Sequence, residues 1–105
     1  RGPGGEGVLR YPSPPGIHPA CCGWLFTPED VFDEGKLLSL LGQTPGVTRL
    51  KGVFHLEDEW ATINRTGTAV SVAPTAYRRD SRLEVFADGL DWETFELELL
   101  ECLID

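Results

Sequence analysis

The residues of this chain best suited to chemistry are a histidine and two cysteines that lie close together. His18, Cys21 and Cys22 form the pattern H-x-x-C-C. Imidazole nitrogen and thiolate sulfur together suit zinc, cobalt or copper. The pattern therefore predicts a candidate metal site, although a structural zinc site takes four ligands. The only other histidine and cysteine are His55 and Cys102.

Neither of these two residues is an obvious fourth ligand. Cys102 stands beside Leu103 in the C-terminal segment, where a free cysteine most often behaves as a small buried apolar residue. His55 shares one face of an extended segment with Lys51, which favours a surface position or the end of a hairpin.

Basic residues form a second set of candidates. In the extended segment 49–56, Arg49, Lys51 and His55 lie on one face, and mainly apolar side chains lie on the other. We interpret this basic face as a contact surface for a partner, and for Lys51 a purely structural role stays open.

A further basic cluster contains Arg78, Arg79 and Arg82 within five positions. One interpretation is a solvated turn whose arginines pair with nearby acids. The other is a contact patch for an anion or for an acidic partner.

Catalytic signatures are weak in this sequence. Nucleophilic catalysis needs a cysteine or serine beside an oriented base, and two histidines with three cysteines set too few constraints. Asp88, Asp91 and Glu93 lack the alternating oxygen donors of a calcium loop and suit a helix N-terminus. The phosphate-binding pattern G-x-x-x-x-G-K-[ST] does not occur. We predict no catalytic residue in the chain.

The elements that must position these residues follow from hydrophobic periodicity and from turn residues. Alternation predicts strands over residues 21–26, 47–56, 60–65, 69–73 and 82–87. Leu37, Leu40 and Leu41 share a helical face over residues 33–41, with Gly42 as a candidate left-handed cap. Asp91 is a suitable N-cap for a second helix that continues to the C-terminus.

The predicted order is β-α-β-β-β-β-α, which indicates an α+β fold. We expect a mainly antiparallel five-stranded sheet with both helices on one face, because each helix carries one apolar stripe. The other sheet face is then left for solvent or a partner domain.

Gly52 interrupts the strand over residues 47–56, and a glycine there indicates that another group needs the space. We expect it to lie beneath one of the tryptophans Trp24, Trp60 and Trp92, all of them candidates for the core. For Trp60, a partly exposed position at an interface is the alternative.

Residues 1–20 hold five glycines and five prolines, and we expect them to form a flexible linker before a domain of residues 21–105. The net charge of −8 disfavours nucleic acid and anionic membranes as partners. No run of about 20 apolar residues predicts a membrane helix. An odd cysteine count and a start at Arg1 without a signal pattern favour a piece of a longer cytoplasmic protein.

Three segments carry a family resemblance, namely residues 48–56 with the dipeptide Lys51-Gly52, residues 60–65 and residues 77–84, flanked by two helices. In this order they resemble the C-terminal domain of the CobW family. The members of this family are phosphate-loop GTPases associated with cobalamin synthesis and metal handling. The resemblance covers about residues 21 to 105.

The resemblance implies an accessory domain that contacts the GTPase domain of the same polypeptide or a metalloprotein client. GTP and Mg²⁺ would bind in that GTPase domain, and zinc or cobalt would be the metal cargo. Family members often carry metal-binding histidines near the domain junction, where His18 stands, but this chain has no histidine-rich run. The alternatives are a metal-buffering domain that uses His18, Cys21 and Cys22, and a small-ligand binder with a pocket between sheet and helices.

Overall fold

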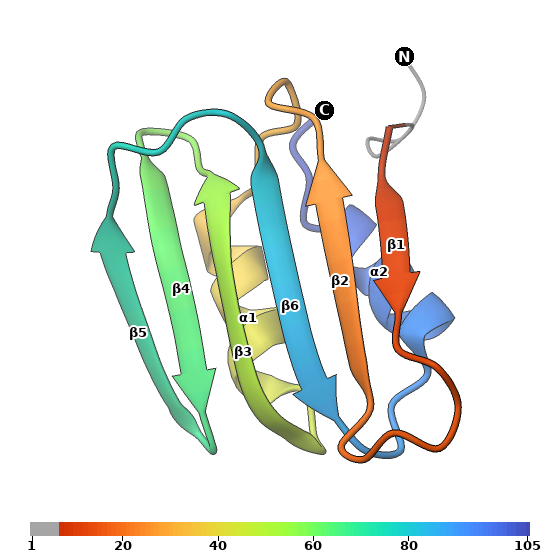
Figure 1. Cartoon of the computed structure of the whole chain (residues 1–105). Helices are drawn as coiled ribbons and strands as arrows, with labels where there is room; N and C mark the ends of the chain where they lie inside the picture. Colours follow the sequence, from red (N-terminus) through yellow and green to blue (C-terminus); the bar gives the residue numbers. More distant parts are fainter. Residues whose placement is uncertain (1–6) are drawn as a thin grey trace.

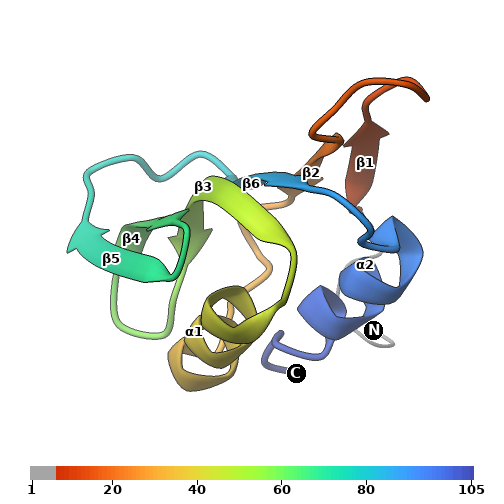
Figure 2. The same ribbon diagram turned by 90° about the horizontal axis from the view of Figure 1, so that it is seen from below.

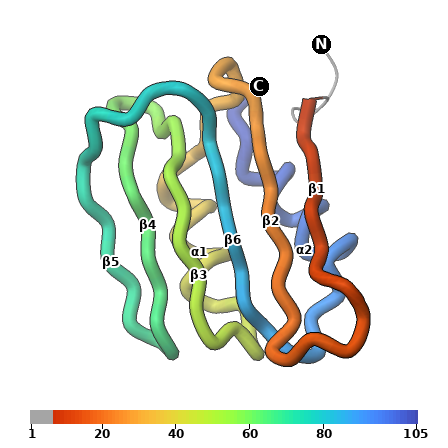
Figure 3. Tube along the Cα trace, viewed as in Figure 1, coloured from red at the N-terminus to blue at the C-terminus, as the bar shows by residue number. Residues whose placement is uncertain are grey.

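The computed structural model describes residues 7–105 and places six strands in one sheet. The strands are β1 (Leu9–Pro12), β2 (Cys21–Phe26), β3 (Val47–His55), β4 (Trp60–Thr66), β5 (Ala69–Pro74) and β6 (Ser81–Ala87). Their order across the sheet is β1-β2-β6-β3-β4-β5, and every neighbouring pair is antiparallel (Figure 1). The path of the chain through these strands can be followed in Figure 3.

Both helices, α1 (Glu34–Gln43) and α2 (Trp92–Leu100), lie on the same side of the sheet (Figure 2). The core fills the space between them and the sheet, because alternate strand residues point toward the helices. Its largest fully buried side chains include Phe26, Phe32, Phe54 and Phe95. The predicted α+β class and the placement of both helices on one face are confirmed.

The strand count is six, whereas the sequence predicted five. Leu9–Pro12, which the sequence analysis assigned to the linker, pairs with β2 as an edge strand, with Leu9 opposite Leu25 and Tyr11 opposite Gly23. Strand pairing uses backbone groups, so a segment rich in glycine and proline can join a sheet edge without an apolar pattern of its own. Residues 1–6 of the expected linker lie outside the described residues, and a domain division at residue 20 stays a prediction.

Helix α1 begins where predicted, since Asp33 is the N-cap and its carboxylate accepts a hydrogen bond from the Lys36 amide at 2.9 Å. The prediction of a glycine cap at Gly42 is wrong. The helix continues to Gln43, and the C-cap is Thr44, whose hydroxyl donates to the Leu40 carbonyl at 2.7 Å.

A buried arginine holds the C-terminal end of α1 against the sheet. Arg65 on β4 is only 5% exposed, and its Nη1 donates to the carbonyls of Leu41 and Thr44, both at 2.8 Å. Its Nε donates to the Gly67 carbonyl at 2.6 Å. Arg65 therefore satisfies carbonyls that a helix end leaves without intrahelical partners.

Helix α2 confirms the predicted N-cap, because Asp91 accepts hydrogen bonds from the amides of Glu93 and Thr94. Phe95 and Leu99 are fully buried on its inner face. Neither helix in residues 7–105 is long and apolar enough to cross a membrane.

Candidate functional site

The sheet face that points away from the helices is the best candidate for a functional surface. Within residues 7–105, neither helix covers it (Figure 2). We call this surface the open face. Its four central strands β2, β6, β3 and β4 contribute the following side chains: Cys21, Leu25, Arg82, Glu84, Phe86, Arg49, Lys51, Val53, His55, Thr62 and Asn64.

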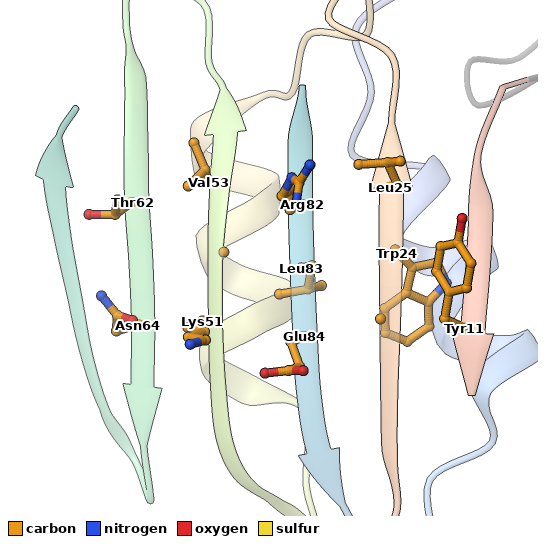
Figure 4. Close-up of a pocket in the computed structure, with 12 residues that line it drawn as sticks. Tyr11, Trp24, Leu25, Lys51, Val53, Thr62, Asn64, Arg82, Leu83 and Glu84 are labelled. Atoms are coloured by element: carbon orange, nitrogen blue, oxygen red, sulfur yellow. The ribbon is translucent and has the colours of Figure 1, made fainter. Parts of the chain in front are cut away.

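A shallow groove of about 710 Å³ crosses the middle of the open face (Figure 4). Apolar side chains such as Tyr11, Leu25 and Val53 line it together with the charged Lys51 and Glu84. A groove with mixed apolar and charged walls is better suited to bind the surface of another protein than to bind a small apolar ligand.

The groove passes over Gly23, which leaves a gap in the row of side chains on β2. Gly23 lies opposite Tyr11 on one side and Glu84 on the other. A Cβ atom at this position would meet only the Leu83 carbonyl at 3.7 Å and the Tyr11 Cβ at 4.0 Å. The space above Gly23 is therefore open, and a larger side chain there would project into the groove.

Arg82 is the most strongly held charge on the open face. Its Nε donates to Asp80 Oδ1 at 2.7 Å and its Nη2 to Oδ2 at 3.3 Å, while the Tyr77 hydroxyl donates to the same carboxylate at 2.6 Å. The hydrogen bond from Arg82 lowers the pKa of Asp80, and the hydrogen bond to Asp80 raises the pKa of Tyr77. The guanidinium is thus fixed at one end of the groove.

Arg49 and Lys51, two further basic residues of the open face, each have a different partner. The Arg49 guanidinium carbon lies 4.8 Å from the centre of the Phe86 ring, a cation–π contact. Lys51 stands directly opposite Glu84 in the pairing of β3 with β6. Opposite charges in such a cross-strand pair stabilise each other modestly and remain accessible to a partner.

His55 lies at the end of β3, as the sequence indicated. Its Nδ1 is 2.8 Å from the Pro28 carbonyl oxygen, and its ring stacks on Trp60 with centroids 4.5 Å apart. Trp60 is 6% exposed, so the structure places it in the interior and not at an exposed interface. The stack leaves His55 held at the rim of the open face.

The structure brings together four of the six predicted interaction residues. Arg49, Lys51, His55 and Arg82 share the open face, whereas 78 and 79 fall in the loop between β5 and β6. The interpretation of the basic cluster as a turn whose arginines pair with acids holds for the Arg82 contact with Asp80.

The three predicted metal ligands do not meet. Cys22 is fully buried on the helix side of β2, while its neighbour Cys21 lies on the open face. His18 Nδ1 is 3.4 Å from Asp88 Oδ1, and its side chain is 78% exposed. Among residues 7–105, no three side chains of histidine, cysteine, aspartate or glutamate are grouped to hold a metal ion. The residues present therefore do not fit a metal site.

The thiols are also poorly suited to act as ligands or nucleophiles. Burial raises the pKa of Cys22 and of Cys102 to about 11. Burial, followed by the nearby Glu84 carboxylate, raises the pKa of Cys21. Since the thiolate is the reactive and metal-binding form, all three cysteines are held in the inactive form at neutral pH. The expected burial of Cys102 is confirmed.

Sequence reasoning missed part of the open face. Tyr11 was assigned to the linker because nothing in its glycine-rich and proline-rich surroundings indicates a strand. Val53, Thr62 and Asn64 could have been predicted to lie on the open face, because alternation along the strands places them on the same face as Lys51. Glu84 follows from its position between two inward residues of β6.

Comparison with known proteins agrees with the expected family. Residues 21–103 match the family model described as "Cobalamin synthesis protein cobW C-terminal domain". The chain is 34% identical over 86 residues to "Zinc chaperone YeiR" of Escherichia coli (strain K12), which covers 76% of this chain and 25% of that protein.

Among solved structures, the chain resembles "Crystal structure of Zn(II)-bound YjiA GTPase from E. coli" with a TM-score of 0.59 and 10% identity. The match covers 90% of this chain and 29% of the YjiA chain, and at this identity it shows a shared fold. The chain thus spans about a quarter of the length of the relatives it matches. Because the family model covers most of the sequence, the chain belongs to the family of the cobalamin synthesis protein cobW C-terminal domain.

Proposed function

We propose that this chain is the non-catalytic docking domain of a metal-handling GTPase and that its open face binds the GTPase domain of the same polypeptide. The observation that carries the proposal is a six-stranded sheet with both helices on one face and a groove lined by apolar and charged residues on the other. A sheet face of this composition resembles one side of an interface between domains.

The size of the relatives supports an occupant in the same polypeptide. The chain spans 25% of YeiR and 29% of the YjiA chain, so those proteins carry most of their mass outside this domain. A domain tethered to its partner reaches a high effective concentration, and a modest interface is then sufficient. A metalloprotein client is the other candidate occupant.

Charge supports the choice of face. The chain carries a net charge of −8, yet the open face presents Arg49, Lys51 and Arg82 around one half-buried carboxylate, Glu84. Complementary potentials steer association and fix the orientation of partners. We therefore expect the matching surface of the GTPase domain to be acidic.

We take zinc and not cobalt as the metal cargo, because the names of both YeiR and the YjiA structure mention zinc. The ion would be held outside this domain, since His18, Cys21 and Cys22 do not meet. GTP and Mg²⁺ would bind in the GTPase domain. A cytoplasmic location stays a prediction, and the three free thiols are compatible with it.

A charge reversal on each side of the molecule tests the proposal. The parent's GTPase domain and this chain are prepared as separate polypeptides, and their affinity is measured by calorimetry. Lys51→Glu places a negative charge in the open-face groove. Lys36→Glu makes the same change of charge on the exposed side of α1 and is the matched control. Loss of an interfacial cation is expected to weaken binding about tenfold or more for Lys51→Glu alone.

Three results would oppose this assignment. Equal weakening by both variants would indicate a long-range charge effect without a defined face. Weakening by Lys36→Glu alone would move the interface to the helices. Unchanged affinity in both variants, together with binding of a client that Lys51→Glu abolishes, would assign the open face to the client.

A further inference from the structure

The strand β5 forms a free edge of the sheet. All six of its residues, Ala69–Pro74, are exposed, and it pairs with β4 alone. No described segment lies beyond it (Figure 1). An edge strand presents a row of backbone N–H and C=O groups that another strand can bind.

The hydrogen-bond pattern identifies which backbone groups point outward. The Thr75 amide donates to the Trp60 carbonyl at 2.9 Å, in the register of the β4–β5 ladder. Hydrogen-bonded pairs alternate along an antiparallel ladder, so Ser71 bonds to β4 as Thr75 does. The backbone groups of Val70 and Val72 therefore point away from the sheet.

The sequence of this edge reads the same in both directions. Residues 69–73 are Ala-Val-Ser-Val-Ala. If a second copy of β5 is laid antiparallel along the edge with a twofold axis at Ser71, Val70 of each copy faces Val72 of the other. These are the residues whose backbone groups are free, so each facing pair can exchange two hydrogen bonds.

The edge also lacks the features that usually prevent such pairing. From Ala69 to Pro74 it has no charged residue and no bulge, and Pro74 only ends the ladder. The opposite edge differs, because β1 has four residues and includes Arg10 and Pro12. Of the two edges, β5 is the one suited to another strand.

Side chains favour the same arrangement. Val70 and Val72 are each 39% exposed on the helix side of β5, and Val70 lies next to Gly42 of α1. In the paired arrangement, valines from both copies would form one apolar strip. On the other face, the side chains of Ala69, Ser71 and Ala73 are small and cause no crowding across the twofold axis.

We infer that β5 binds β5 of a second copy of this chain, antiparallel and with Ser71 on the twofold axis, so that one sheet continues through both copies. The groove of the open face and the partner assigned to it play no part in this contact. The interface is an edge, so the dimer is weak and depends on protein concentration. Both copies are negatively charged, and at moderate salt their mutual repulsion is screened at distances beyond about 8 Å.

Site-specific cross-linking tests the register. In a Cys21→Ser background, Ser71→Cys places two thiols across the axis, where Cα atoms of a non-hydrogen-bonded pair lie about 4.5 Å apart. The matched control Ala73→Cys places them about 13 Å apart, beyond disulfide reach. Paired thiols meet at millimolar effective concentration, so Ser71→Cys should cross-link about tenfold faster or more.

A second readout uses the chain without added cysteines. The amides of Val70 and Val72 should exchange hydrogen more slowly as protein concentration rises, while the Ser71 amide, already bonded to β4, should not change. Equal cross-linking at positions 71 and 73 would overturn the inference, as would faster cross-linking at 73. Exchange at Val70 and Val72 that is independent of concentration would also overturn it.

Discussion

At the scale of single residues, the most consequential side chain outside the open face is Arg65. It is buried and donates to three carbonyls, two of which lie at the end of α1. A charged donor to several buried acceptors is costly to remove, because the acceptors lose their partners. This residue joins the sheet to the helix layer.

Replacing Arg65 is therefore expected to destabilise the fold. Arg65→Met keeps the length of the side chain and removes all three hydrogen bonds, which should lower the free energy of unfolding by about 2 to 4 kcal/mol. Arg49→Met is the matched control, with an expected loss below about 1 kcal/mol for one exposed cation–π contact. Urea unfolding measures both. A loss for Arg65→Met no larger than for Arg49→Met would contradict this role.

The buried thiols predict a pH dependence of stability. Burial raises the pKa of Cys22 and Cys102 to about 11 in the folded chain. Between roughly pH 8.5 and pH 11 the unfolded chain loses these protons first, so stability is full below this window and falls as pH rises through it. The expected loss is about 3 kcal/mol per thiol.

The measurement compares urea unfolding at roughly pH 8 and pH 10.5 for two chains: the native chain and the double variant that carries both Cys22→Ala and Cys102→Ala. The alanine variant starts less stable, because it leaves cavities in the core. Its stability should nevertheless fall less steeply as pH rises, because it lacks the two thiols. Lysines and tyrosines also titrate in this range, but they contribute equally to both chains. Parallel pH curves for the two chains would show that the thiols are not responsible.

At the scale of elements, strands and helices with a clear periodicity were predictable, because side-chain pattern and burial coincide there. β6 is an example, with Leu83 and Val85 inward as expected. β1 was not predictable, since its backbone pairs with β2 and its side chains remain exposed. The end of α1 was mispredicted at Gly42 because Thr44 and the distant Arg65 bind its carbonyls.

Gly52 gives a prediction at this scale. The sequence indicated that it makes room for a large side chain, and the structure identifies Phe54 in place of a tryptophan. A Cβ at Gly52 would lie 2.7 Å from the Phe54 ring and 2.5 Å from the Arg82 carbonyl oxygen. Gly52→Ala should thus destabilise the chain by about 2 kcal/mol through overpacking.

Gly23→Ala is the control on β2, because its Cβ would meet only ordinary contacts. We expect a change below about 1 kcal/mol, since alanine is no worse than glycine inside a strand. Thermal unfolding of both variants suffices as the measurement. If Gly52→Ala were as stable as Gly23→Ala, β3 and β6 would not be packed as closely as described.

At the scale of the whole molecule, the open face was predictable and its full composition was not. Two amphipathic helices implied a sheet covered on one side, and alternation placed Lys51 and Arg49 on the other. Tyr11 was missed together with β1. The expected metal ligands are not brought together, for a reason already present in the sequence: adjacent residues of a strand, such as Cys21 and Cys22, point to opposite faces.

The central claim is that this domain acts by docking its open face on the GTPase domain of the same polypeptide. The most direct measurement is a backbone amide NMR titration of the labelled 105-residue chain with that GTPase domain. The account predicts that the largest chemical-shift changes map to Lys51, Val53, Arg82 and Glu84. Changes centred on the outer sides of α1 and α2, with the open-face signals unmoved, would contradict it.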